Sequence, residues 1–543
     1  MAQQDHNEGG VEELSSSAAA GLASLVGIGC QSGDVVMGLS ALRRVNGLAF
    51  VFADTDIAPG TMAEVSRQQK SGTRVFRVSP LSQMTASAGR TDVSIMGVKS
   101  GSLADGIRAR LESRNESSTT QEQSMKREHQ GSASFTHLLE GIGREELKIT
   151  EIKITPISYK PADGSYVHEC GPVVLTKCDE TVVEVFTDQG LVGIAPGATR
   201  LGNHDHLIGR NPFDVELMAL SPGLDVACWD LIGKAKGVPV YKLLATDTDP
   251  SPKVKAYASG GVNWTYYDKG DGSAYGAEAL IEEALGYKEM GFDTFKWRPG
   301  TDWEEDGITP TVLGEICRQL REAVGPDFDL GLEKKGYDTW TLEECLEIAP
   351  IIDELGFLFF EQPMGDVGEA QFDDYLRLKE TMPRVMLWGG EGLRSASEMR
   401  PWLVQGIYDA LQTDCHRIGV TENWYIGRVA GYYGRKMVMH NWNSGLGTMC
   451  NAHYIAGVPS GHMVEFFLYP NEFRYGLFTE PMRPHDGYIV LSDKPGFGLE
   501  LAPDFAERFP HIPGTNTFAN PRYPHALERA RVRSQAVVER YNK

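Results

Sequence analysis

Three glutamates follow short apolar runs at intervals of about thirty residues, a spacing that could assemble a cation site. Glu333 ends FDLGLE, Glu361 ends FLFFE, and Glu391 follows VMLWGG. If these runs are neighbouring strands of one sheet, their carboxylates meet at its edge. Carboxylate oxygens are the ligands that Mg²⁺ prefers, whereas Zn²⁺ usually recruits His or Cys. We therefore expect a Mg²⁺ site formed by these three residues.

Other apolar runs of the same kind deliver a base and several charged groups. Lys296 and Arg298 lie in FKWR, Asp414 follows DALQT, and His440 follows KMVM. A carboxylate substrate bound to the cation has a more acidic α-proton, and a histidine titrates in the right range to remove it. Asp414 would fix the tautomer of His440, and Lys296 would stabilise the enediolate. Protonated His440 could then protonate a β-hydroxyl, which leaves as water.

Glu465, in MVEFF, could give the substrate carboxylate a hydrogen bond if burial keeps it protonated. Each of these residues alone is more often an ordinary turn residue. Their occurrence after successive apolar runs is what favours a site. His416, His453 and His462 lack such a setting, and we expect them to be structural.

The elements that must position these residues alternate regularly from Val254 onward. Strand-like runs recur every 25–35 residues with helical stretches between them, which predicts a (β/α)₈ barrel over residues 253–480. Residues 146–252 read as antiparallel strands and a helix, an α+β capping domain that residues 480–505 complete. The strand in GYIVL is expected to return to the first sheet of that domain.

The two ends of the chain have a different texture. We expect disorder in residues 1–17, a small αβα domain in 18–111, and a linker in 112–145, which is rich in Glu, Gln and Ser. Residues 506–543 form a C-terminal tail whose main pattern is a charged helix. The predicted fold class is thus α/β, a TIM-type barrel with a capping domain behind an N-terminal αβα domain and linker.

The bulk composition excludes several classes of protein. With 41% hydrophobic residues and a formal net charge of −22, the whole chain is a poor partner for nucleic acid. Its eight cysteines include no CxxC pair, and no apolar run reaches the roughly 18 residues of a membrane span. We expect a cytoplasmic enzyme with a small carboxylate substrate and no membrane contact.

Residues from about 147 to 500 resemble the enolase superfamily, in its mandelate racemase-like branch and of the acid-sugar dehydratase type. The segments that match are GLDVACWDLIGKAKGVPVYKLL, FKWRPG, FFEQP, GGEGL, LQTDCHRIGVTE and MHNWNSGLGT. The resemblance implies a Mg²⁺ enzyme that abstracts the α-proton of a carboxylate, and it implies a homo-oligomer. It implies that Glu333, Glu361 and Glu391 hold the metal, that Asp414 and His440 are the catalytic dyad, and that Lys296 and Glu465 contact the substrate. We expect the catalytic and substrate-binding residues to include Lys296, Arg298, His440, Glu465 and, for binding, Trp442.

Two residues depart from that family's pattern. The third-strand ligand is usually an Asp, and here it is Glu333 followed by two lysines. The second strand usually offers a second lysine as a base on the opposite face, and here Arg298 stands in that place. Arginine rarely gives up its proton, so one base remains. Dehydration can run on one base, whereas racemisation needs two. The sequence therefore predicts a hydro-lyase that converts an aldonate or aldarate to a 2-keto-3-deoxy acid, with a racemase or epimerase as the alternative.

Residues 18–111 also resemble the ribosomal, kink-turn-RNA-binding family in GDVVMGLSALRRV and LAFVFADTDIAPGTMAEV. This segment has ten Lys and Arg against six Asp and Glu, a charge opposite to that of the rest. RNA contact by residues 18–111, with a secondary or inactive barrel, is the third reading of the chain. A scaffold role for the segment is the simpler alternative.

Overall fold

The computed structural model divides into two compact units, Met1–Ala133 and Ser134–Lys543, which are described separately. The described residues run from 11 to 541 with gaps. The longer gaps are 1–10, 112–140, 198–203, 262–276, 299–306 and 334–339. Shorter gaps occur between 15 and 111 and at 171, 216, 218–219, 247–248, 443, 470 and 542–543. Most of the expected linker thus lies outside the described residues.

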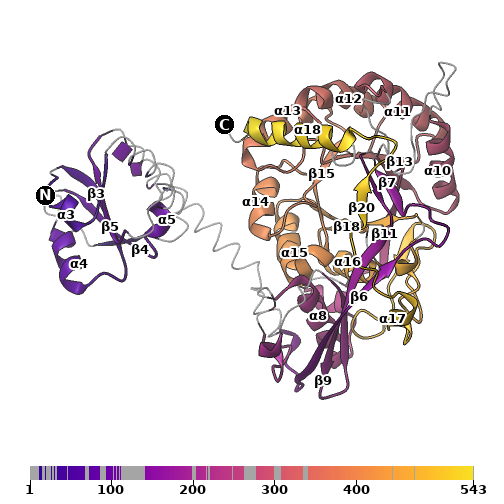
Figure 1. The fold of residues 1–543 in the computed structure, drawn as a ribbon, viewed down its shortest axis with the longest axis horizontal. Coiled ribbons are helices and arrows are strands. Elements are labelled where there is room, and N and C mark those ends of the chain that lie inside the picture. The colour runs from indigo at the N-terminus through magenta and orange to yellow at the C-terminus, as the bar shows by residue number, and fades with distance from the viewer. Residues whose placement is uncertain are drawn as a thin grey trace, which may run out of the picture. The chain divides into compact units, whose positions relative to one another are not determined.

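The first unit is a five-stranded sheet with helices on both faces (Figure 1). Alternate residues of its central strand, β3, pack into two separate apolar clusters. Phe50 and Phe52 belong to one cluster, and Val51 and Ala53 belong to the other. This is the expected αβα arrangement. The sheet order is β1-β4-β3-β5-β2. The strands are Glu12–Leu14, Val35–Met37, Leu48–Asp54, Arg74–Val78 and Ile95–Lys99 (β1–β5), and the helices are Leu39–Leu42 (α3), Pro59–Ser66 (α4) and Ser82–Thr85 (α5).

One part of the expected N-terminal disorder is wrong. Residues Glu12–Leu14 form β1, which pairs in parallel with β4. Glu12 makes an ion pair with Arg74 at 2.6 Å, and Leu14 packs against the larger apolar cluster. The β4 edge supplies backbone hydrogen bonds to this short strand, which adds to the side-chain contacts.

The capping domain of the second unit is an antiparallel sheet, β10-β9-β6, covered by one helix. Its strands are Ile149–Tyr159 (β6), Cys178–Thr187 (β9) and Val192–Pro196 (β10), and its helices are Pro222–Lys236 (α8) and Val240–Leu244 (α9), with a short 3₁₀ turn at Asp205–Leu207. Residues 141–145, expected to end the linker, instead pack on this domain. Arg144 pairs with Asp214 at 2.8 Å, and Glu145 pairs with Lys236 at 2.7 Å.

The rest of the second unit contains a closed barrel of eight parallel strands, as the sequence predicts. Each strand pairs in parallel with the next, and the first, β11, pairs with both β12 and β18. Helices surround the ring (Figure 1). The strands are Lys253–Gly260 (β11), Thr294–Trp297 (β12), Asp329–Glu333 (β13), Phe359–Glu361 (β14), Met386–Gly389 (β15), Ala410–Thr413 (β16), Lys436–Met439 (β17) and Gly461–Phe467 (β18). The helices are Glu278–Glu289 (α10), Pro310–Val324 (α11), Leu342–Glu354 (α12), Phe372–Thr381 (α13), Ala396–Val404 (α14), Cys415–Tyr432 (α15) and Gly445–Gly457 (α16).

The barrel interior is filled by an apolar layer on the N-terminal side of the charged residues. Phe359 and Trp388 stack at a centroid distance of 3.6 Å, and Tyr257 meets both rings edge-on. Val438 and Met463 complete the layer. Because this layer is closed, the polar groups at the strand ends face the C-terminal mouth, where the catalytic residues of such barrels lie.

The strand expected to return to the first sheet pairs elsewhere. Tyr488–Val490 (β19) runs antiparallel to the start of β11, which projects beyond its barrel neighbours. The loop that follows does reach the capping domain, since the Phe497 amide donates to Asp230 at 2.8 Å. The chain then forms Phe505–Arg508 (α17), Thr517–Ala519 (β20) and Ala526–Tyr541 (α18).

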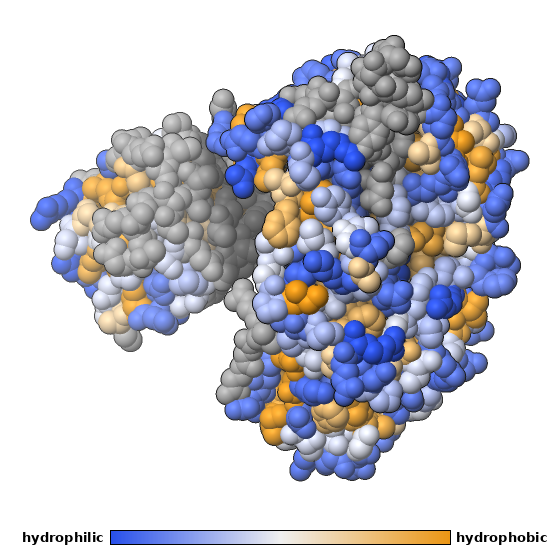
Figure 2. Space-filling model, turned by 45° about the vertical axis from the view of Figure 1, so that its right-hand side comes forward, coloured by the Kyte–Doolittle hydropathy of each residue, from blue (hydrophilic) through white to orange (hydrophobic). Residues whose placement is uncertain are grey.

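A second small sheet, β20-β8-β7, joins the C-terminal segment to the hairpin of His168–Cys170 (β7) and Val173–Leu175 (β8). On the face of the second unit shown in Figure 2, apolar residues form small separate spots among hydrophilic ones. No helix in the described part of the chain combines the length and apolar character needed to cross a membrane.

Candidate active site

The predicted residues of the barrel lie at the C-terminal ends of seven successive strands. Glu333 and Glu361 are the last residues of β13 and β14, and Glu391 follows β15 by two residues. Asp414 and His440 come directly after β16 and β17. Lys296 lies in β12 and Glu465 lies in β18. Arg298 directly follows β12, and Trp442 lies on the loop after β17. Ion pairs, hydrogen bonds and one cation–π contact connect these nine residues into one region.

Lys296 is the centre of this region. Its ammonium lies 2.8 Å from Glu333, 3.2 Å from Glu361 and 2.7 Å from Glu465, and the side chain is buried. Burial works to lower the pKa of Lys296, but the charges of the three carboxylates outweigh it and raise the pKa well above its usual value. Lys296 is therefore a fixed cation and not a base near neutral pH.

Glu465 is held ionised by its surroundings. It accepts hydrogen bonds from Ser259 Oγ at 2.6 Å, from the indole of Trp442 at 2.9 Å and from the amide of Asn441 at 3.1 Å. Burial works to raise its pKa, yet the charge of Lys296 outweighs burial and brings the pKa down to about 2. The expectation that burial keeps Glu465 protonated is therefore wrong.

His440 and Asp414 form the expected dyad. His440 Nδ1 lies 3.0 Å from Asp414 Oδ2, so the carboxylate fixes the tautomer with Nε2 free to act as a base. Asn451 Nδ2 and the amide of His416 donate to the other oxygen of Asp414 at 3.1 and 2.9 Å. Burial works to raise the pKa of Asp414, but the hydrogen bond with His440 and the charge of His440 hold it below its usual value.

The base also faces the predicted cation site, since His440 Nε2 lies 3.4 Å from Glu391 Oε2. Within the described residues, no group of three or more His, Cys, Asp or Glu is drawn together as a metal cluster, and Lys296 lies between Glu333 and Glu361 instead. The side chains of Glu333, Glu361 and Glu391 nevertheless fit Mg²⁺, because all three are carboxylates.

The pKa of Glu361 reports how closely these acids are packed. Burial raises it most, followed by the charge of Glu333 and, less strongly, that of Glu391. This crowding of negative charge is what a divalent cation relieves.

Arg298 lies at the rim of the site. Its guanidinium pairs with Glu333 Oε2 at 2.6 Å and stacks over the ring of Trp442 at 4.3 Å. Arginine remains charged at any pH that the fold tolerates. Arg298 can therefore attract a substrate carboxylate or hydroxyl, but it cannot serve as a second base.

Comparisons with known proteins agree with this arrangement. Residues 279–505 match the family model described as enolase C-terminal domain-like. The arabinonate dehydratase of Saccharolobus solfataricus is 30% identical over 288 residues, which cover 53% of this chain and 71% of that enzyme.

The chain belongs to the enolase superfamily, in its mandelate racemase-like branch.

Further relatives come from the same superfamily. The D-galactarolactone cycloisomerase of Agrobacterium fabrum is 29% identical and the D-gluconate/D-galactonate dehydratase of Picrophilus torridus 26%, with matches covering 54% and 59% of this chain and 74% and 77% of theirs. Among solved structures, the 3,6-anhydro-D-galactonate cycloisomerase of Zobellia galactanivorans covers 67% of this chain and 99% of its own at a TM-score of 0.53 and 22% identity. At that identity the structural likeness shows the fold alone.

One functional group was not found from the sequence. Glu180, on β9 of the capping domain, accepts from Ser444 Oγ at 2.8 Å and lies 3.1 Å from His416 Nε2. Ser444 lies on the loop after β17, which also carries His440, and His416 lies in the first turn of α15, two residues after Asp414. The structure thus gives His416 a buried carboxylate partner that the sequence reading denied it. Only its position two residues after Asp414 could have signalled this role.

Proposed function

We propose that the barrel catalyses the Mg²⁺-dependent dehydration of a sugar acid, an aldonate or aldarate, to a 2-keto-3-deoxy acid. Membership of the superfamily makes the chain an enzyme, and the dehydratases among its relatives are carbon–oxygen lyases. The single observation that carries the proposal is the His440–Asp414 pair, with Nε2 directed at the carboxylate cluster.

His440 performs both proton transfers in this reaction. Its Nε2 takes the proton from the carbon next to the substrate carboxylate, and Asp414 stabilises the imidazolium that results. The same Nε2–H then donates that proton to the hydroxyl on the next carbon. The carbon–oxygen bond breaks, the hydroxyl leaves as water, and the enol that remains tautomerises to the 2-keto acid.

Charged groups around the base stabilise the negative charge that develops on the substrate carboxylate. Glu333, Glu361 and Glu391 would hold the Mg²⁺ ion, which when bound withdraws electron density from that carboxylate and acidifies the α-proton. Lys296 adds a fixed positive charge at the same place, because its three carboxylate partners keep it protonated.

Dehydration is favoured over epimerisation because the described mouth offers one suitable base. Arg298 replaces the second lysine of the family pattern and is ion-paired with Glu333. A racemase or epimerase must remove and return the α-proton on opposite faces, and an arginine that stays protonated cannot do so. Loss of water needs only His440.

The test is a screen of the purified chain with Mg²⁺ against four- to six-carbon aldonates and aldarates, with formation of 2-keto acid as the readout. His440→Asn is the control, because it keeps the size of the side chain and removes the proton-transferring nitrogen. Product from the wild type but not from His440→Asn supports the proposal. Recovery of an epimer without loss of water would favour the racemase alternative.

RNA contact by residues 18–111 stays a prediction. Two of the arginines in this segment already pair with acidic residues. Arg43 lies 2.7 Å from Glu64, and Arg74 pairs with Glu12. Salt-dependent RNA binding by the full chain, with no turnover of any sugar acid, would support the reading in which the barrel is secondary.

A further inference from the structure

The hairpin of β7 and β8 reaches the barrel mouth from the capping domain. His168, the first residue of β7, meets the ring of Trp442 edge-on at 4.9 Å and that of Phe467 at 6.3 Å. Trp442 in turn donates to Glu465, and the guanidinium of Arg298 lies over its ring at 4.3 Å. One aromatic ring therefore separates His168 from the charged centre of the site.

His168 has a polar capacity that the protein leaves unused. The residue is only 7% exposed, and neither ring nitrogen hydrogen-bonds to a described residue. Buried polar groups in native proteins are nearly always hydrogen-bonded, so an imidazole in this position calls for a ligand or water. Burial and the nearby charge of Arg298 lower its pKa to about 3, so the ring is neutral and can both donate and accept.

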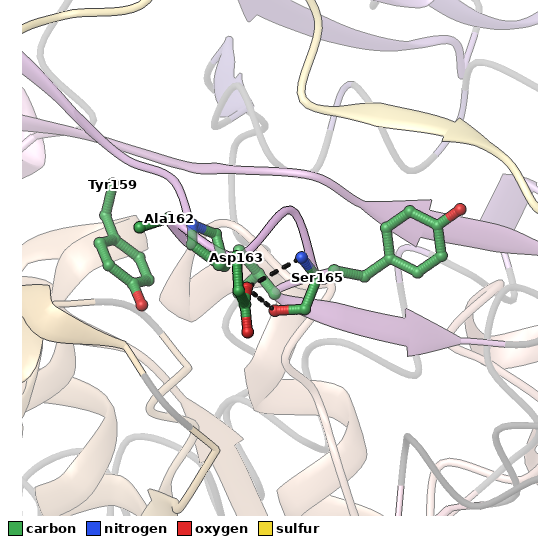
Figure 3. A pocket seen from close by; sticks show the side chains of 7 residues that line it. Tyr159, Ala162, Asp163 and Ser165 are labelled. Atoms are coloured by element: carbon green, nitrogen blue, oxygen red, sulfur yellow. Dashed lines mark hydrogen bonds between the residues drawn. The ribbon is translucent and has the colours of Figure 1, made fainter.

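A cavity of about 490 Å³ lies on the loop between β6 and β7, which leads into His168. Its lining residues run from Tyr159 to Val167, immediately before His168, and include the hydroxyl groups of Tyr159, Ser165 and Tyr166. Figure 3 shows Asp163 turned toward Ser165. Its carboxylate accepts hydrogen bonds from the Ser165 amide at 3.0 Å and from the Ser165 hydroxyl at 2.7 Å. The loop before His168 is thus ordered by its own Asx turn.

The hairpin is held in place by the C-terminal segment. β20 adds a third strand to β8, with Thr517, Phe518 and Ala519 opposite Leu175, Val174 and Val173. Asn520 donates to Glu169 on β7 at 2.9 Å. Nearby, Lys177 Nζ donates to the carbonyl of Ile512 at 2.6 Å. Residues 512–520 therefore fasten both strands of the hairpin.

The other end of the same segment is fastened to the barrel. Arg533 of α18 binds both carboxylate oxygens of Glu344 at 2.6 and 2.7 Å, and Tyr541 donates to Asp374 at 2.6 Å. These acids lie in the first turns of α12 and α13, at the C-terminal end of the strands, and Figure 1 shows α18 beside both helices. Glu344 also closes the capping box of α12 with Thr341, so its position is fixed.

We propose that residues 517–541 are a positioning element of the active site that holds His168 over the mouth of the barrel, where its ring hydrogen-bonds a hydroxyl of the sugar acid remote from the carboxylate. This rests on the proposed function for the substrate class. His168 is the specificity-determining residue, and Arg533, Glu344 and Asn520 act through it. The fold thereby uses its last helix to set which acids bind.

The first experiment tests the clamp without any substrate. Hydrogen exchange of the peptide covering residues 166–176 is compared in the wild type, in Arg533→Ala and in Arg531→Ala. Arg531 is the matched control, because it lies on the same helix and, among the described residues, pairs only with Glu528, at 3.9 Å. Arg533→Ala should speed exchange in the hairpin several-fold, and Arg531→Ala should leave it unchanged. Equal exchange in all three proteins, at equal melting temperature, overturns the clamp.

The second experiment tests His168 on the panel of acids. His168→Phe keeps the aromatic contact with Trp442 and removes the hydrogen bonds, whereas His168→Asn keeps a donor and an acceptor. His168→Phe should raise the KM of five- and six-carbon acids roughly tenfold and leave kcat within about threefold. A three-carbon acid, added to the panel as a control, should be unaffected. His168→Asn should recover part of the loss. A uniform change for all chain lengths, or no change, overturns the inference.

The two proposals fail in different ways. If the wild type turns over no acid, the proposed function fails, and the binding of the same acids to the wild type and to His168→Phe, measured by calorimetry, then decides the role of His168. If the wild type dehydrates acids but His168→Phe keeps its chain-length preference, the function stands and the inference is wrong.

Discussion

Arg298 and Glu333, the two residues that depart from the family pattern, are bound to each other: Nη2 of the arginine lies 2.6 Å from Oε2 of the glutamate. The same glutamate oxygen lies 2.8 Å from Lys296. The longer acid on β13 thus meets the longer cation beyond β12. The two departures from the family pattern thus form one ion pair. With an arginine in place of the second lysine, the barrel mouth has no base at that position.

The Arg298–Glu333 pair should show strong coupling. Arg298→Lys and Glu333→Asp should each lower kcat/KM at least tenfold, because each shortens one side of a buried ion pair. The double variant should be less impaired than the sum of the two, with a coupling energy of about 0.5–3 kcal/mol in a double-mutant cycle. Additive losses would show that the two residues act independently.

Asp414→Asn should leave the fold intact and lower kcat by about 10²–10⁴-fold. The amide can donate to Nδ1 and so favours the wrong tautomer of His440. The check is kcat of the variant and of the wild type, measured with the same acid and Mg²⁺. A kcat close to that of the wild type in Asp414→Asn would contradict the dyad.

If the three glutamates bind Mg²⁺, removing the metal should change how the stability of the wild type compares with that of Glu361→Gln. Glu361→Gln relieves the crowding of carboxylates, so with EDTA its melting temperature should equal or exceed that of the wild type. Adding Mg²⁺ should raise the melting temperature of the wild type by several degrees and leave that of Glu361→Gln unchanged. A Mg²⁺-dependent rise of equal size in both proteins would place the ion elsewhere.

The contact between Glu180 and His416 should make stability depend on pH in the alkaline range. Burial works to lower the pKa of His416, but the charge and hydrogen bond of Glu180 outweigh it and raise the pKa to about 9. A raised pKa contributes stability that is complete below the unfolded value of about 6.5 and is lost as the pH rises through about 9.

Thermal unfolding of the wild type and of His416→Gln between pH 6.5 and 9.5 checks this. The difference between their melting temperatures should be a few degrees at pH 6.5 and should shrink toward pH 9.5. A constant difference across that range would mean that the contact is not an ion pair.

The barrel and its site could be predicted because their signal is local. Each candidate site residue stands near the C-terminal end of an apolar strand, and parallel strands bring such positions to one face, so Glu361, Asp414 and His440 needed no knowledge of distant contacts. The types of residue also pointed to the proposed chemistry, since a histidine beside an aspartate and three acids suits proton abstraction next to a metal-bound carboxylate.

Other features depend on partners far away in the sequence. His416 gains its role from Glu180, which lies 236 positions earlier in the chain. β20 is three residues long and exists because the edge of β8 accepts it. β19 pairs with β11 and not with the capping sheet, because the start of β11 projects from the barrel. The ionised state of Glu465 likewise follows from Lys296, which no spacing reveals.

The most direct measurement of the central claim is the reaction followed by proton NMR in D₂O, with Mg²⁺ and the best acid from the panel, for the wild type and His440→Asn. The wild type should form a 2-keto-3-deoxy acid, no epimer of the substrate should accumulate, and His440→Asn should form no product. An epimer labelled at the α-carbon with no loss of water, or full turnover by His440→Asn, would contradict this claim.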